Sequence, residues 1–133
     1  MKTILSAMLF LTFLFVSEAQ TTKSQVSQQW HLATYVKTEF QNVSIPQSKG
    51  ALVSSDSLFS DGMDYLSLQS DEYRLNIGDN KSYGVWSLSQ NTIKLGKDIF
   101  DIESINSKYL VLSKEEYYPS SQLKIITKLF LYR

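Results

Sequence analysis

The chain has no cysteine, a single histidine and only two prolines among its 133 residues. The lack of cysteine excludes disulfides and thiolate metal sites, so a metal would have only oxygen donors and one imidazole. Acidic and basic side chains balance at 13 each, and no basic run occurs. Such a chain lacks the positive surface that binds nucleic acid or an anionic membrane. We therefore expect no nucleic-acid partner, no metal and no cofactor.

Residues 4–16 form an uncharged, largely apolar run behind Lys2. Ser17 and Ala19 then place small residues three and one positions before a cut after Ala19. This pattern predicts a cleaved signal peptide over residues 1–19. The alternative is a membrane anchor, but the run is shorter than the roughly 20 residues of a spanning helix. The expected mature chain is one domain, residues 20–133, exported to the periplasm or secreted, with no membrane span.

Short runs of alternating apolar and polar residues make up most of the mature sequence. No helical period persists, and residues 21–28 suggest a flexible lead or one helical turn. Short turns with Asn, Gly, Asp and Ser separate most of the runs. The eight candidate strands cover residues 30–36, 65–69, 73–77, 82–89, 92–95, 99–105, 109–113 and 123–132. This spacing predicts an all-β fold, a single eight-stranded antiparallel up-and-down barrel.

Alternation also assigns the two faces of each strand. In the first strand, Trp30, Leu32 and Val36 are expected on one face. In the last, Lys124 and Lys128 mark the solvated side.

The same alternation turns Ile126, Phe130 and Tyr132 outward, which is apolar for a solvated face. These three either pack under the N-terminal segment or form a partner surface.

Residues 41–64 are the least regular part of the mature chain. They contain Pro46, Gly50, Gly62 and several serines among isolated apolar residues. A connection of this length is often functional, for example as a lid. The alternative is a wandering connection with a short strand near Leu52.

Four short motifs resemble the lipocalin-like domain family, specifically its small exported bacterial members. They are Trp30-His31-Leu32, Ser70-Asp71-Glu72-Tyr73-Arg74-Leu75, Gly84-Val85-Trp86-Ser87-Leu88 and Ile93-Lys94-Leu95. The resemblance implies a lipocalin-like barrel, and with it non-catalytic binding of a small hydrophobic molecule.

Seven residues on the expected inner faces of consecutive strands are candidate ligand contacts. None carries a charge, which favours an apolar or aromatic ligand. The alternative is that they simply fill a small barrel. The seven are Tyr73, Leu75, Trp86, Leu88, Phe100, Ile102 and Leu110.

The other candidate residues do not indicate catalysis or metal binding. His31 lies opposite Trp30 without an evident nucleophile, so we expect a solvated strand residue and no enzyme. Asp56, Asp61 and Asp64 do not follow a calcium-loop spacing. Residues 115–118 suggest a solvated hairpin end.

The expected function is therefore non-catalytic binding of a small hydrophobic ligand. The alternative is a protein–protein interaction module with a filled barrel, which would use residues 41–64 or the apolar outer stripe.

Overall fold

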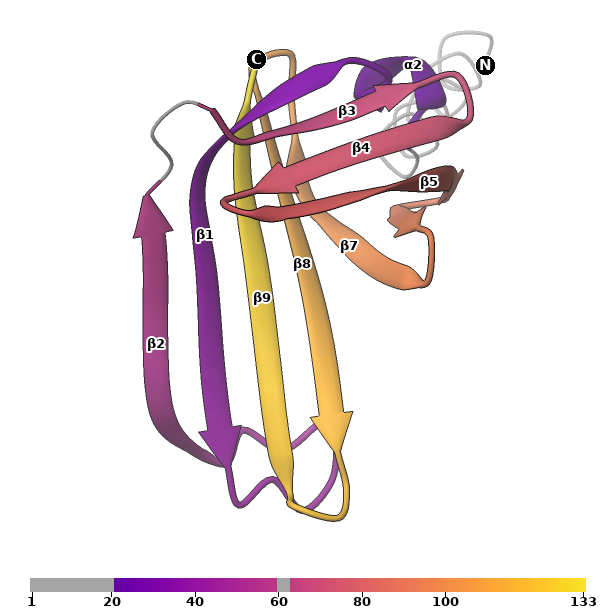
Figure 1. Ribbon diagram of the computed structural model, residues 1–133. Helices are drawn as coiled ribbons and strands as arrows, with labels where there is room; N and C mark the ends of the chain where they lie inside the picture. The colour runs from indigo at the N-terminus through magenta and orange to yellow at the C-terminus, as the bar shows by residue number, and fades with distance from the viewer. Residues whose placement is uncertain (1–20, 60–62) are drawn as a thin grey trace, which may run out of the picture.

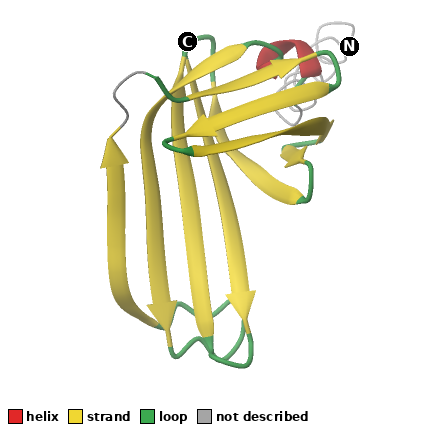
Figure 2. Ribbon diagram, in the orientation of Figure 1, coloured by secondary structure: helices red, strands yellow, loops and turns green. Residues whose placement is uncertain are grey.

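The computed structural model describes residues 21–59 and 63–133, so the expected signal peptide lies outside the described residues. Most of the described chain is β-strand (Figure 2). The elements are α2 (Lys23–Val26), β1 (Gln29–Gln41), β2 (Ala51–Phe59), β3 (Tyr65–Gln69), β4 (Glu72–Ile77), β5 (Asn80–Ser89), β6 (Thr92–Leu95), β7 (Asp98–Ile105), β8 (Tyr109–Tyr118) and β9 (Leu123–Tyr132). Within this part of the chain, no helix has the length and apolar character needed to cross a membrane.

Strands β1 and β3 to β9 close into an eight-stranded antiparallel barrel, which confirms the predicted fold class. Consecutive strands from β3 to β9 pair as neighbours, and β1 completes the ring by pairing with both β3 and β9. Closure removes most of the sheet edges that would otherwise present unpaired backbone groups.

The long strands β1, β8 and β9 continue beyond the barrel, and together with β2, which pairs with β1, they form a sheet extension (Figure 1). We define the sheet extension as residues 34–41, 51–59, 114–118 and 123–128, in the strand order β2-β1-β9-β8. Two sequence predictions are corrected here. Residues 51–59 form a nine-residue strand, in place of a lid-like loop or a short strand near Leu52, and β8 runs to Tyr118 instead of ending at residue 113.

A β-bulge in β1 changes which side chains face inward. The register slips between Leu32 and Thr34, so alternation restarts there. Trp30 and Leu32 are buried inside the barrel, as predicted. Tyr35 rather than Val36 then pairs with the buried Leu129, so the prediction that Val36 shares the face of Trp30 was wrong. A bulge inserts one residue and so exchanges the faces beyond it.

Large apolar side chains fill the barrel interior. The fully buried ones that contribute most volume are Trp30, Leu32, Leu66, Leu68, Ile93, Leu95, Leu110, Leu112 and Leu129. Trp86 joins them with only 2% of its surface exposed, while its neighbour Val85 is 68% exposed. The predicted faces of β5 are therefore confirmed.

The short helix α2 closes one end of the barrel. Val26 is fully buried there, and the indole nitrogen of Trp30 donates a 3.0 Å hydrogen bond to its carbonyl. The ammonium of Lys23 pairs with Asp71 at 2.8 Å and lies 5.2 Å from the ring centre of Trp86. We call the opposite end of the barrel, from which the long strands continue (Figure 1), the mouth.

The outer face of the sheet extension is partly covered by residues 42–50. Val43 is fully buried, and its carbonyl accepts a 2.7 Å hydrogen bond from the Tyr117 hydroxyl. Lys124 is only 9% exposed: its ammonium pairs with Glu115 at 2.7 Å and donates to the carbonyl of Pro46 at 2.9 Å. The prediction of a solvated Lys124 was therefore wrong, because this segment folds over it.

Candidate ligand-binding site at the barrel mouth

A hollow of ≈ 270 Å³ lies where the inner face of the barrel continues into that of the sheet extension. Its walls come from the end of β4, the start of β7, the second half of β8, the first half of β9 and the middle of β1. The lining residues are Tyr35, Lys37, Leu75, Ile77, Asp98, Phe100, Lys114, Glu116, Tyr118, Ile125, Thr127 and Leu129.

The floor of the mouth hollow is apolar. Leu129 and Phe100 belong to the buried core, and Tyr35, Leu75 and Ile77 are half-buried and pack against that core. The alternation of β4 explains this, because Leu75 and Ile77 follow Tyr73 on the inward face. The core of the barrel therefore grades into a partly open apolar surface at this end.

The rim of the mouth hollow is polar and internally paired. The Lys114 ammonium lies 3.1 Å from Glu116 and 3.3 Å from Asp98, and 5.6 Å from the ring centre of Phe100. The Tyr118 hydroxyl donates a 2.6 Å hydrogen bond to the other oxygen of Glu116. These contacts hold the rim side chains in one arrangement above the apolar floor.

The same contacts shift the pKa values of the rim groups. Hydrogen bonds from Tyr118 and Lys114 lower the pKa of Glu116, outweighing its partial desolvation. Burial disfavours the Lys114 ammonium, but Glu116 and Asp98 more than compensate and raise its pKa. Both groups are therefore charged at neutral pH, and the local charges offset one another.

The seven predicted contact residues all lie on inward faces, but the structure divides them. Leu75 and Phe100 line the mouth hollow. Tyr73, Trp86 and Leu110 are buried in the barrel core, and Leu88 and Ile102 are partly buried against it. Depth along each strand separates the two groups, and alternation alone carries no information on depth.

The sequence did not predict the polar rim, because residues 115–118 resemble a solvated hairpin end. The signal was present: Lys114, Glu116 and Tyr118 continue the alternation of the buried Leu110 and Leu112. The inward position of Tyr35 was not predicted, because the bulge in β1 that turns this side chain inward has no clear mark in the sequence.

Two other candidate residues, His31 and Asp64, make contacts within the fold. The ring of His31 lies 5.4 Å from that of Tyr132, centre to centre. Asp64 is buried, and its carboxylate accepts a hydrogen bond from the backbone of Gly78 at 2.9 Å. Asp61 lies outside the described residues. In the part of the chain that the structure describes, no three His, Asp or Glu side chains are grouped to hold a metal ion.

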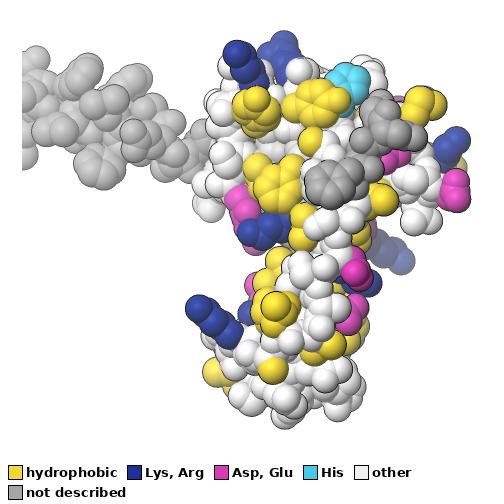
Figure 3. All heavy atoms as spheres, turned by 90° about the vertical axis from the view of Figure 1, so that its left-hand side faces the viewer, with side chains coloured by type: hydrophobic (Ala, Val, Ile, Leu, Met, Phe, Trp, Pro, Cys, Tyr) yellow, Lys and Arg dark blue, Asp and Glu magenta, His cyan; other side chains and the backbone are white. Residues whose placement is uncertain are grey.

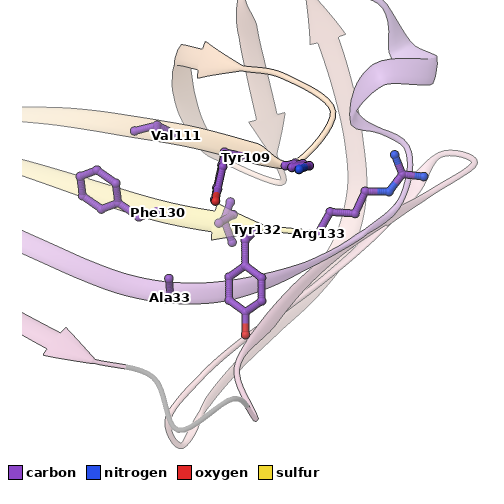
Figure 4. A pocket seen from close by; sticks show the side chains of 8 residues that line it. Ala33, Tyr109, Val111, Phe130, Tyr132 and Arg133 are labelled. Atoms are coloured by element: carbon purple, nitrogen blue, oxygen red, sulfur yellow. The ribbon is translucent and has the colours of Figure 1, made fainter.

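A second, larger hollow of ≈ 740 Å³ lies on the outside of the barrel, across β1, β9 and β8 (Figure 4). We call it the outer groove; it is lined by Ala33, Lys108, Tyr109, Val111, Phe130, Leu131, Tyr132 and Arg133. Tyr109 is 57% exposed, and Phe130 and Tyr132 are 37% exposed each. The expectation that Phe130 and Tyr132 face outward is confirmed, and Figure 3 shows hydrophobic side chains at the surface beside the histidine.

No protein-family model matches the chain, and no curated protein matches it. The fold itself places the chain among proteins built on a closed eight-stranded antiparallel barrel, consistent with a calycin-like fold. A barrel of this kind is compatible with ligand binding and with an interaction module.

Proposed function

We propose that this protein is an exported, non-catalytic, lipocalin-like binding protein that holds a small hydrophobic molecule at the barrel mouth. The observation that carries the proposal is the half-buried apolar floor of Tyr35, Leu75 and Ile77 beneath a fixed polar rim. Pockets for small molecules combine such a mainly apolar lining with a few placed polar groups.

The size and charge of the mouth hollow narrow the ligand. Its volume of ≈ 270 Å³ suits a compact molecule or one end of a longer one. Two lysines, Lys37 and Lys114, line the hollow together with two carboxylates, Asp98 and Glu116. The charges leave no surplus of either sign, so the best ligand is uncharged, with its apolar part on the floor.

Titration with the neutral fluorescent probe N-phenyl-1-naphthylamine tests the proposal. We expect saturable binding to residues 20–133, weakened about tenfold by Ile77→Gln, because a buried amide on the floor lacks a partner. Val85→Gln is the matched control, since Val85 lies on the outer face of the neighbouring strand. No binding below about millimolar, the range of roughly −4 kcal/mol, would remove the proposal.

The packed barrel favours one second candidate, an interaction module. Leu52, Val53 and Leu58 of β2 are exposed, and β2 pairs only with β1 among the described strands. Such an edge is suited to adding a strand from a protein partner. A failed probe titration, together with loss of a purified partner's binding in Ser55→Pro, would favour this candidate.

A further inference from the structure

The outer groove gathers three aromatic side chains on an outward face of the barrel, where the described residues leave them partly exposed. Tyr109 and Tyr132 are paired across β8 and β9, and Val111 and Phe130 form the next pair. Both pairs lie on the outer side, where Tyr109, Phe130 and Tyr132 are exposed, and Figure 4 shows the two pairs on neighbouring strands. Ala33, the extra residue at the β1 bulge, adds a short side chain beside them.

The dimensions of this apolar surface suit a short tail or a fused ring system. Two residues along an antiparallel strand span about 7 Å, and three adjacent strands span about 10 Å. The groove volume of ≈ 740 Å³ lies within the usual range for small-molecule sites, about 300–1,000 Å³. A protein side chain or a compact amphiphile would therefore fit, whereas a long extended lipid chain would leave the groove.

Charge distinguishes the two ends of the groove. Lys108 and Arg133 lie at one end, where the backbone nitrogen of Arg133 donates to the carbonyl of Lys108 at 2.9 Å. The guanidinium of Arg133 extends away from Tyr109 and Phe130 (Figure 4) and donates to the carbonyl of Ser107 at 3.5 Å. Of the described residues that line the groove, none is acidic. At the other end, Lys128 is the next residue of β9 on the same face as Phe130. Its ammonium lies 3.3 Å from the carboxylate of Glu103, which neutralises its charge.

We propose that the outer groove binds a small amphiphile with an anionic head, a carboxylate or sulfonate, and an apolar or aromatic tail. The head lies at the Lys108 and Arg133 end, and the tail lies over Tyr109, Val111 and Phe130. Aromatic faces supply large apolar area at low entropic cost, and the basic end of the groove selects the sign of the head group. This site is separate from the barrel mouth and does not depend on the function proposed there.

Two matched dyes separate the sites. Anilinonaphthalene sulfonate is N-phenyl-1-naphthylamine with an added sulfonate, so any difference in binding reports the anionic head. For the sulfonate dye, we expect Phe130→Gln to weaken binding about tenfold and Ile77→Gln to leave it unchanged. If Ile77→Gln instead abolishes binding, the anion occupies the mouth and the outer site is wrong, while the mouth proposal survives.

The head-group assignment is tested by the double variant Lys108→Gln with Arg133→Gln. Exposed charge pairs contribute up to about fivefold each, so we expect a loss of roughly tenfold for the sulfonate dye and none for the neutral dye. Lys94→Gln with Lys97→Gln is the control, because both lysines are exposed and neither lines the groove. Unchanged circular dichroism establishes that each variant is folded.

Competition identifies the ligand class. Decanoate should displace the sulfonate dye from the wild-type groove, and decanol should displace it at least several-fold less well. Equal displacement by both would overturn the role of the cations. If anionic vesicles but not decanoate compete, the groove recognises a membrane surface and the proposal of a free amphiphile fails.

Discussion

Two glycines determine how closely the ring of Tyr73 approaches its neighbours. Gly84 is its direct partner across β4 and β5, and a Cβ there would lie 3.2 Å from the ring. At Gly96 a Cβ would lie 2.9 Å from the Tyr73 hydroxyl, which itself is 2.9 Å from the Ser82 hydroxyl. Tyr73 is therefore a packing residue, and its position requires glycine at residues 84 and 96.

Comparison of Gly96→Ala with Gly78→Ala separates this contact from backbone strain. The two glycines have positive φ of +63° and +59°, but only at Gly96 does a new Cβ meet another atom. The left-handed conformation should cost each variant about 1–2 kcal/mol. We expect a further loss of about 1 kcal/mol or more for Gly96→Ala, from overpacking. Urea unfolding measures both, and equal losses would show that Tyr73 moves aside freely.

At the scale of elements, residues 42–50 and β9 stabilise one another through Lys124. Besides Glu115 and Pro46, its ammonium reaches the carbonyl of Ser48 at 3.3 Å. Removal of the ammonium leaves those acceptors without a donor in a mostly buried place, which usually costs more than losing an exposed pair.

Lys124→Met should lower the free energy of unfolding by about 1–3 kcal/mol and speed amide exchange in residues 42–50. Lys128→Met is the control, because the Lys128–Glu103 pair is half-exposed and should be worth less than about 1 kcal/mol. The interpretation would be wrong if both variants lost the same stability, or if exchange in residues 42–50 stayed unchanged.

The rim of the mouth makes the free energy of unfolding depend on pH in the acid range. The pKa of Glu116 is lowered in the folded protein by Tyr118 and Lys114. A lowered folded pKa contributes stability above the unfolded value of about 4.5, and this contribution is lost as pH falls through the folded value. Glu116→Gln should therefore flatten the fall in stability below about pH 4.5. A Tyr118→Phe variant should raise the Glu116 pKa in a carbon-detected titration, and an unchanged pKa would refute the hydrogen bond.

At the scale of the whole molecule, the barrel and the sheet extension differ in how far their side chains are buried from solvent. The barrel encloses an apolar core closed by α2, whereas the sheet extension has a paired polar inner face and an outer face partly covered by residues 42–50. The mouth hollow lies at their junction, and the outer groove lies on the outside of the same three long strands.

We predict that the mature molecule begins at Gln20. Ser17 and Ala19 fit the small-residue pockets of a signal peptidase, and residues 4–16 provide the apolar segment. Mass spectrometry of the amino terminus, on protein from the envelope or secreted fraction of expressing cells, tests this. An intact Met1 on the protein in that fraction would contradict cleavage.

The sequence by itself determined the strand periods, most of the short turns and the closed barrel. The strand periods and turns are local, because alternation with period two places Val85 and Trp86 on opposite faces without reference to distant residues. The barrel was predicted from the number and spacing of these strands. The outward position of Phe130 and Tyr132 followed from the same rule.

Only the tertiary structure decided the bulge at Ala33, the burial of Lys124 and the division of the inward residues between core and mouth. Each depends on pairing or cover by residues far away in the sequence. The bulge follows from the register of β1 on β9, and the cover of Lys124 comes from Pro46 and Ser48, 78 and 76 residues away. Alternation specifies the face of a side chain, but only the assembled barrel specifies what lies over that face.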